Sequence, residues 1–114
     1  MTKYIKATAK DLADTLLKKG MVSFAARCET DNNGEILDCE DWFGAAIINQ
    51  FDGQHLLVTS YGGGMCFVYD VTQINDIVPV AVAESAFAYL ISHDLQIHDN
   101  TVCVELTPEH DLVV

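Results

Sequence analysis

The sequence has no lysine or arginine after residue 27. All six lysines and arginines lie before that point, whereas only Asp11 and Asp14 of the 17 aspartates and glutamates do, and the formal net charge is −11. A surface this acidic repels nucleic acids and anionic membranes and attracts basic protein surfaces. We therefore expect no direct binding to nucleic acid or to a membrane, and we expect a basic protein as the partner.

Long apolar runs are also missing. No segment reaches the roughly 18 consecutive apolar residues of a membrane-spanning helix. The N-terminus, MTKYIKATAKD, lacks the apolar stretch of a signal peptide. The sequence thus predicts a cytoplasmic protein. Its length and its hydrophobic content of 50% predict one acidic domain covering residues 1–114.

Cysteines with the Cys-x-x-Cys spacing of zinc ribbons and redox motifs are absent. The four cysteines, Cys28, Cys39, Cys66 and Cys103, are isolated from one another in the sequence. In a cytoplasmic protein this predicts four free thiols that pack as small hydrophobic side chains. A Cys28–Cys39 disulfide is the alternative, and it would indicate an exported protein.

The first helix is predicted over residues 9–19. Thr8 and Asp11 have the spacing of a capping box, and apolar residues recur with helical periodicity up to Gly20, a good residue for a helix C-terminus. Alternating apolar residues separated by turn signals begin at Met21. The expected strands cover about residues 21–28, 36–42, 43–51, 55–61, 65–71 and 101–106.

A second helix is predicted over residues 79–94, because its apolar residues have helical spacing and a proline suits its first turn. The segment Pro79–Ala83 could instead form a short strand. The fold class is α+β: a single antiparallel sheet of about five to six strands arranged as a meander, with two α-helices packed on one face.

Residues 29–40, ETDNNGEILDCE, partly match an EF-hand calcium loop. Asp31, Asn33, Gly34 and Glu40 occupy loop positions three, five, six and twelve, but position one is Glu29, where the pattern has aspartate. An EF-hand also needs a helix on each side, whereas the flanking residues here alternate like strands. A hairpin turn explains the Asp, Asn and Gly residues equally well. We expect a hairpin, and cation binding by this loop stays open.

Two further stretches could carry chemistry. YGGGMC, residues 61–66, lacks the lysine and the spacing of a phosphate-binding loop, so we expect a turn. HDLQIHD, residues 93–99, contains metal-ligand residue types, although a histidine near a helix end is often only a cap. The sequence contains no G-x-S-x-G, H-E-x-x-H or recognisable Cys–His signature. We expect a protein that is not an enzyme and that has no cofactor, catalytic residues or metal ligands.

Six carboxylates cluster within 13 residues, directly before the only tryptophan. They are Glu29, Asp31, Glu35, Asp38, Glu40 and Asp41, and Trp42 follows them. Duplex DNA carries one charge per roughly 1.7 Å of axis, and carboxylates on a two-stranded ribbon with a rise of roughly 3.3 Å per residue imitate part of that density. These seven residues form the predicted partner-binding surface, in which Trp42 either packs in the core or anchors the partner.

In size and charge the chain resembles the small acidic inhibitors of phages and plasmids, such as anti-CRISPR and anti-restriction proteins, and the immunity proteins that neutralise nuclease toxins. The resemblance implies an inhibitor that occupies the basic groove of a nucleic-acid-binding enzyme or effector complex. It rests on size and charge and transfers no functional residues. Two alternatives stay open: a small metal- or ligand-binding module that uses the 29–40 loop, and a small enzyme with an unrecognised site.

Overall fold

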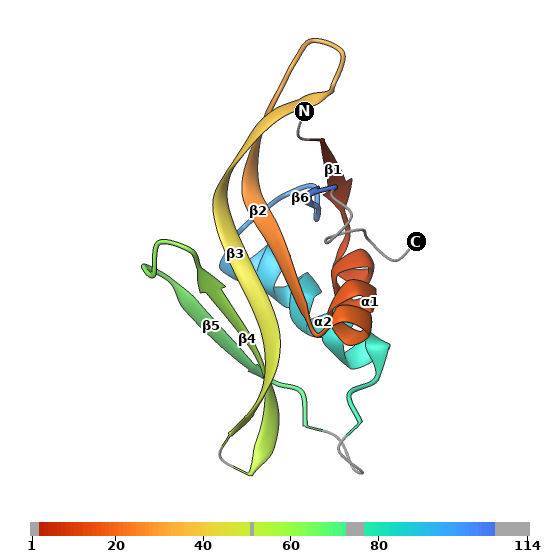
Figure 1. Cartoon of the computed structure of the whole chain (residues 1–114), viewed down its shortest axis with the longest axis vertical. Helices are drawn as coiled ribbons and strands as arrows, with labels where there is room; N and C mark the ends of the chain where they lie inside the picture. The colour runs from red at the N-terminus through yellow and green to blue at the C-terminus, as the bar shows by residue number, and fades with distance from the viewer. Residues whose placement is uncertain (1–2, 51, 73–76, 107–114) are drawn as a thin grey trace.

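A computed structural model describes residues 3–50, 52–72 and 77–106. In this part of the chain, one six-stranded antiparallel sheet is covered by two helices (Figure 1). The elements are β1 (Tyr4–Ala7), α1 (Ala9–Lys19), β2 (Met21–Thr30), β3 (Ile36–Gln50), β4 (Gly53–Ser60), β5 (Cys66–Asp70), α2 (Val80–Tyr89), the π-helical turn η2 (Leu90–Asp94) and β6 (Val102–Glu105). The predicted α+β class with a single sheet is confirmed.

The first helix has the bounds that its capping residues predict. The Thr8 hydroxyl accepts a hydrogen bond from the Asp11 amide, and the Asp11 carboxylate accepts one from the Thr8 amide, which together form a capping box. At the other end Gly20 adopts a left-handed conformation with φ of 87°, which a glycine reaches without steric cost. The C-terminal glycine of α1 therefore also fixes where β2 begins.

The hydrophobic core lies between the helices and one face of the sheet. Phe24 of β2 stacks on Phe43 of β3 with ring centroids 5.6 Å apart, and Phe87 of α2 meets Phe24 edge-on at 6.3 Å. Leu12 and Leu16 of α1 are buried in the same cluster. Burial of each such side chain stabilises the fold by roughly 1.5–3 kcal/mol, so this layer dominates the stability of the domain.

The sheet has the order β1-β6-β2-β3-β4-β5. Strands β2 to β5 form the predicted meander. The last strand, β6, instead returns to the free edge of β2, and the unpredicted strand β1 pairs outside it, with Ile5 opposite Val104. This return brings Cys103 beside Ala25, two residues that are far apart in the sequence.

The predicted break between strands at residues 42 and 43 is wrong. Strand β3 runs continuously for 15 residues, and it is distorted at Asp41, whose φ is 61°. The ladder continues on both sides of this point, with Ala25 opposite Trp42 and Arg27 opposite Glu40. In Figure 1 the outer half of the β2–β3 hairpin extends beyond the helices, at one end of a molecule that measures 48 × 27 × 23 Å.

The second helical segment covers nearly the predicted residues, since α2 and η2 together run from Val80 to Asp94, and it starts as a helix rather than a strand. Pro79 is extended and precedes the first turn, and Val80 begins α2. After Tyr89 the hydrogen bonding widens into η2, in which Leu90 and Ile91 are buried. No helix in the described residues is long and apolar enough to cross a bilayer.

Candidate interaction surface at the β2–β3 hairpin

The hairpin tip is a turn organised by the side chain of Asp31. The Oδ1 atom of Asp31 accepts hydrogen bonds from the backbone amides of Asn33 at 2.8 Å and Glu35 at 2.9 Å. Gly34 has a positive φ of 82°, as the Asn-Gly turn signal predicts. Asp31 therefore has a structural role in the turn, and one of its carboxylate oxygens is already engaged in hydrogen bonds.

The calcium-loop residues belong to this hairpin and not to a helix–loop–helix. Both flanks are strands, β2 and β3. Glu40 lies opposite Arg27, well down the ladder from the turn that Asp31 organises. The carboxylates of the partial motif are therefore spread along the ribbon, whereas an EF-hand gathers its ligands around one point.

Two carboxylates face each other where the hairpin leaves the body of the protein. Glu29 and Asp38 are paired across β2 and β3, and both residues are exposed. Like charges in directly opposite positions destabilise a sheet. This part of the hairpin therefore keeps a concentrated negative charge at some cost in stability.

Arg27 partly neutralises the base of the same acidic cluster. Its Nε atom lies 2.6 Å from Oδ2 of Asp41, and its Nη2 atom lies 3.3 Å from Oε2 of Glu40. The sequence does not signal this, because Arg27 precedes the cluster and reaches it only across the ladder. The three side chains are more than half exposed, so the ion pairs contribute at most about 1 kcal/mol each to stability. Among the carboxylates of the cluster, Glu29, Glu35 and Asp38 neither organise the turn nor pair with Arg27.

Trp42 lies at the inner end of the cluster and is half-buried. Its ring packs against Tyr4 at 6.3 Å between centroids, and it also lines a cleft of about 900 Å³. Arg27, Asp41 and the segment 94–97 also line this cleft. The packing role expected for Trp42 is therefore present, since the ring packs against a small core cluster, and part of its surface also lines the cleft.

The glycine-rich turn after β4 forms a further wall of this cleft. Residues 61–65 connect β4 to β5 as the predicted turn, held by the Ser60 amide bonding to the Met65 carbonyl at 2.9 Å. The Tyr61 ring lies over Gly44, where an added Cβ would come within 3.3 Å of it. The Tyr61 hydroxyl also hydrogen-bonds with that of Ser23. Gly44 therefore permits a close approach that positions an aromatic side chain beside the cleft.

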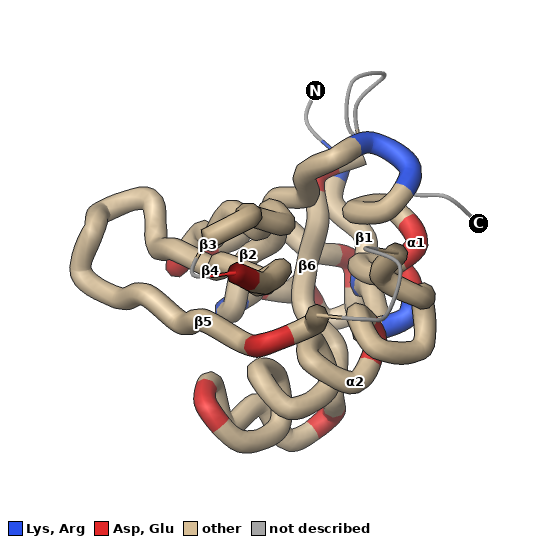
Figure 2. The backbone as a smooth tube through the Cα atoms, turned by 90° about the horizontal axis from the view of Figure 1, so that it is seen from below, with Lys and Arg blue, Asp and Glu red and all other residues tan. Residues whose placement is uncertain are grey.

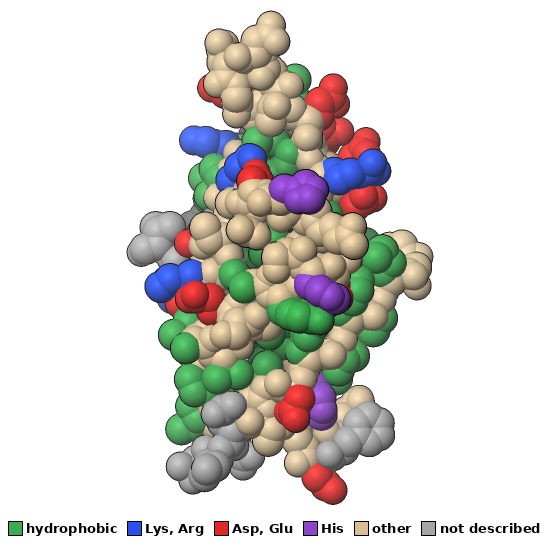
Figure 3. All heavy atoms as spheres, turned by 180° about the vertical axis from the view of Figure 1, so that it is seen from behind, with side chains coloured by type: hydrophobic (Ala, Val, Ile, Leu, Met, Phe, Trp, Pro, Cys, Tyr) green, Lys and Arg blue, Asp and Glu red, His purple; other side chains and the backbone are tan. Residues whose placement is uncertain are grey.

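Charge is unevenly distributed over the rest of the molecule. Figure 2 shows red segments spread over several strands, helices and loops, whereas blue segments are few. On the face in Figure 3 several blue side chains lie next to red ones. Ion pairs outside the hairpin include Lys6–Asp99 and Lys10–Asp14. Most basic residues therefore lie away from the hairpin tip, on other strands and helices.

The histidine and aspartate residues of the stretch 93–99 do not form a common site. Asp99 forms an ion pair with Lys6 at 2.8 Å. Asp94 accepts a hydrogen bond from the Tyr69 hydroxyl, and its other oxygen lies 3.1 Å from Nδ1 of His93. The hydrogen bond from Tyr69 lowers the pKa of Asp94, and burial followed by that same bond raises the pKa of Tyr69. The hydrogen bond between Tyr69 and Asp94 attaches η2 to strand β5.

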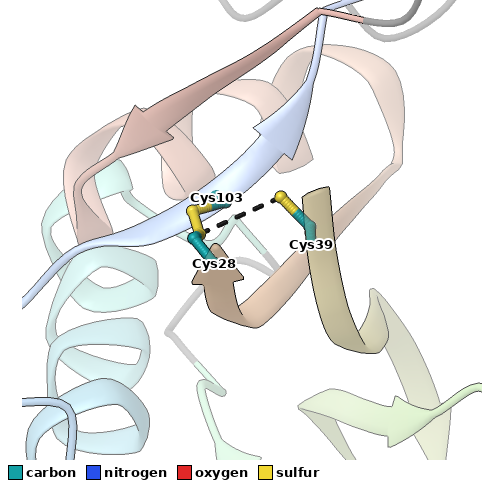
Figure 4. A group of neighbouring side chains, drawn as sticks. All are labelled: Cys28, Cys39 and Cys103. Carbon is teal, nitrogen blue, oxygen red and sulfur yellow. Dashed lines mark hydrogen bonds between the residues drawn. A yellow bond between two sulfur atoms is a disulfide. The ribbon is translucent and has the colours of Figure 1, made fainter. Parts of the chain in front are cut away.

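The prediction of four free thiols is wrong for two cysteines. Cys28 and Cys103 form a disulfide beside the free Cys39 (Figure 4), and Cys66 is also free. The alternative pairing, Cys28 with Cys39, is not formed, although these sulfurs are 3.9 Å apart. Burial raises the pKa of the Cys39 thiol, and the charges of Asp38 and Glu105 raise it further. Sequence spacing gives no signal of this cluster, because β6 brings in its third member.

No family model, curated protein sequence or solved structure matches this chain. Its function therefore has to be inferred from its own residues and their arrangement.

Proposed function

We propose that this protein is a non-catalytic binding protein that inhibits a basic, nucleic-acid-binding partner by occupying its groove. The binding surface comprises the hairpin carboxylates Glu29, Asp31, Glu35, Asp38, Glu40 and Asp41, together with Trp42. The observation that carries the proposal is the unneutralised pair of Glu29 and Asp38 on a hairpin that extends from the body. The partner class includes the targets of anti-CRISPR, anti-restriction and nuclease-immunity proteins, and we place the interaction in the cytoplasm, where such partners act.

The hairpin has the shape as well as the charge for this role. A two-stranded ribbon is narrow enough to enter a groove as wide as the DNA major groove, which admits such ribbons. The carboxylates lie on both strands of the ribbon, and Trp42 with its cleft lies at the inner end. An interface with charged residues outside and a half-buried aromatic inside has the usual distribution of steering and anchoring residues.

The proposal predicts how binding depends on salt. Charge complementarity acts mainly on the association rate, and it weakens as the Debye length falls to about 10 Å at 0.1 M salt. The partner should therefore associate fast at low salt and more slowly as salt increases. Duplex DNA should compete, because both ligands need the same basic groove.

The test begins with affinity capture of basic nucleases and effector complexes on the immobilised protein at low salt. A captured, purified partner is then titrated with the wild type and with the double variant Glu29→Gln/Asp38→Asn. The matched control is Asp52→Asn/Glu84→Gln, which removes the same net charge. Asp52 lies between β3 and β4, beyond the end of β3 that is away from the hairpin turn. Asparagine retains the oxygen with which Asp38 accepts the Cys39 amide and tolerates the positive φ at Asp52.

The hairpin variant should associate at least several-fold more slowly than the control at low salt, and the difference should shrink as salt rises. Duplex DNA should displace the wild type from the partner. Equal rates for both variants, or a complex that forms in the presence of saturating DNA, would show that the acidity serves only solubility.

The cleft beside Trp42 favours a second candidate function, the binding of a small ligand. A volume of about 900 Å³ lies within the range of ligand sites, and the lining mixes apolar residues with Arg27, Asp41 and Gln96. Trp42 is the only tryptophan, so its fluorescence reports on the cleft directly. A small molecule that changes this emission in the wild type, and binds equally well to Glu29→Gln/Asp38→Asn, would favour the ligand-binding function.

A further inference from the structure

Three cysteine sulfurs meet at the base of the hairpin. Cys28 of β2, Cys39 of β3 and Cys103 of β6 point toward one another (Figure 4). Their Sγ atoms all lie within 4.8 Å of one another, and those of Cys28 and Cys39 are 3.9 Å apart. This is the only such group of potential metal ligands in the described residues. The fold thus brings three cysteine sulfurs from three strands to one point.

The spacing of the sulfurs matches that of a trigonal metal–thiolate site. Sulfurs bound at roughly 2.3 Å from one ion, as in zinc sites, are about 4 Å apart when three of them surround it in a plane. The Cys28–Cys39 separation already has this value. Once the Cys28–Cys103 bond is reduced, its two sulfurs can separate to the same distance, since their α-carbons are 6.7 Å apart.

The surroundings favour a soft cation. Cys39 and Cys103 are buried, and the cluster is enclosed by apolar groups from Tyr4, Ile36 and Trp42. Thiolates in such an apolar shell prefer soft closed-shell ions such as Cu(I) and Zn²⁺ over Ca²⁺ or Mg²⁺. The negative charges of the Asp38 and Glu105 carboxylates are felt at the Cys39 sulfur, and this negative potential favours a cation beside that sulfur.

We propose that the reduced protein binds one thiophilic d10 metal ion, Cu(I) or Zn²⁺, through the thiolates of Cys28, Cys39 and Cys103. A phosphine reductant first opens the disulfide: it becomes the phosphine oxide by taking the oxygen of one water, and the two sulfurs take two electrons and two protons. Metal binding then forms three metal–sulfur bonds and releases three thiol protons. The bound ion joins β2, β3 and β6 at the base of the hairpin. This site uses none of the carboxylates of the 29–40 loop and does not depend on the proposed function.

The test uses the full-length protein, reduced with a phosphine under anaerobic conditions. Zn²⁺ alone and Cu(I) alone are titrated in competition with a chromophoric chelator, and protected thiols are counted by alkylation and mass spectrometry. We expect a 1:1 complex that protects three of the four thiols and raises the melting temperature. The two arms identify the ion, because Zn²⁺ requires a fourth donor such as water and Cu(I) does not.

Two serine variants make the test specific. Cys39→Ser should weaken binding by more than the roughly 100-fold that loss of an outer-shell partner costs. Cys66→Ser, which changes the exposed free cysteine outside the cluster, should bind as the wild type does. Circular dichroism of both variants checks that the fold is retained. The proposal is overturned if neither ion protects three thiols, if Cys39→Ser binds like the wild type, or if binding requires Cys66.

Discussion

Glu29 and Asp38 lie directly opposite each other across strands β2 and β3, with only the Thr30–Ile36 pair between them and the turn. Like charges in this position oppose strand pairing. Their nearest basic side chain on the ladder, Arg27, is already paired with Glu40 and Asp41. Natural proteins break such local rules mainly at functional sites, and for this reason the pair is central to the proposed function.

The repulsion between these two residues predicts a stabilising substitution. Glu29→Gln should raise the free energy of unfolding by about 0.2–1 kcal/mol, the range for cross-strand pairs. The gain should be larger at low salt, because exposed charges are screened as ionic strength rises. Urea unfolding at two salt concentrations measures both effects. Asp52→Asn is the control, and an equal gain from it would assign the effect to net charge alone.

The hydrogen bond between Tyr69 and Asp94 predicts a pH dependence of stability. Because this bond lowers the pKa of Asp94 below its ordinary 3.8, it stabilises the protein above that pH and is lost as the pH falls through the lower folded-state pKa. For Tyr69 the folded-state pKa is raised, so its contribution is complete below the ordinary value of 10.0 and is lost at higher pH.

Tyr69→Phe should therefore reduce stability at neutral pH, by roughly 1.5 kcal/mol for a hydrogen bond to a charged group. The loss should become smaller below about pH 4, where the carboxylate of the unfolded state takes up a proton, and it should keep shrinking as the pH falls through the lower folded-state pKa. Urea unfolding between pH 2 and 7 measures the slope. Tyr89→Phe removes the hydroxyl of a neighbouring ring that meets Tyr69 edge-on, and it should leave the acid slope unchanged. A pH-independent loss in Tyr69→Phe would contradict the assignment.

The disulfide predicts a redox-dependent stability. Cys28 and Cys103 are 75 residues apart, and closing a loop of this length stabilises a fold by on the order of 4 kcal/mol. In metal-free buffer, reduction should lower the urea midpoint of the wild type, and Cys103→Ser should unfold like the reduced wild type under both conditions. Cys66→Ser should behave as the wild type does. Mass spectrometry without reductant should find two free thiols, and four would show that the bond is not formed.

Local signals predicted the parts of the fold that depend on neighbouring residues. The capping box at Thr8 and the glycine at position 20 gave the exact bounds of α1, and Asn33-Gly34 gave the hairpin turn. Strand β1 has only four residues, and it is stabilised by pairing with β6 at the far end of the chain. A short strand whose partner is distant has no local signal, so it was not predicted.

The site was predictable only where charge is contiguous in the sequence. The six carboxylates could be identified from residues 29–41, but their partial neutralisation by Arg27 follows from strand register. The three-cysteine cluster follows from the return of β6 to the edge of β2. Both features depend on which strands become neighbours, and this is decided by packing of the whole sheet.

Asp41 allows a test of what sets the direction of the β2–β3 hairpin. Its φ of 61° within β3 is a conformation that Asp and Asn tolerate better than other residues with a side chain, and the strand is distorted there. Its ion pair with Arg27 is more than half exposed and contributes at most about 1 kcal/mol. Holding a β-branched residue in the left-handed region costs about 1–3 kcal/mol. The backbone effect should therefore exceed the charge effect at this position.

Three substitutions at Asp41 separate the two effects. Asp41→Asn removes the charge but tolerates the backbone, so it should change the free energy of unfolding by less than about 1 kcal/mol. Asp41→Gly also removes the charge and relieves the backbone strain of the positive φ. Asp41→Val should lower the free energy of unfolding by about 1–3 kcal/mol or force the strand to straighten. Urea unfolding gives the energies, and the fluorescence of the adjacent Trp42 reports a change in strand direction. Equal stability of the asparagine and valine variants would show that the distortion at Asp41 carries no strain, and the hairpin would then owe its direction to the Arg27 ion pairs.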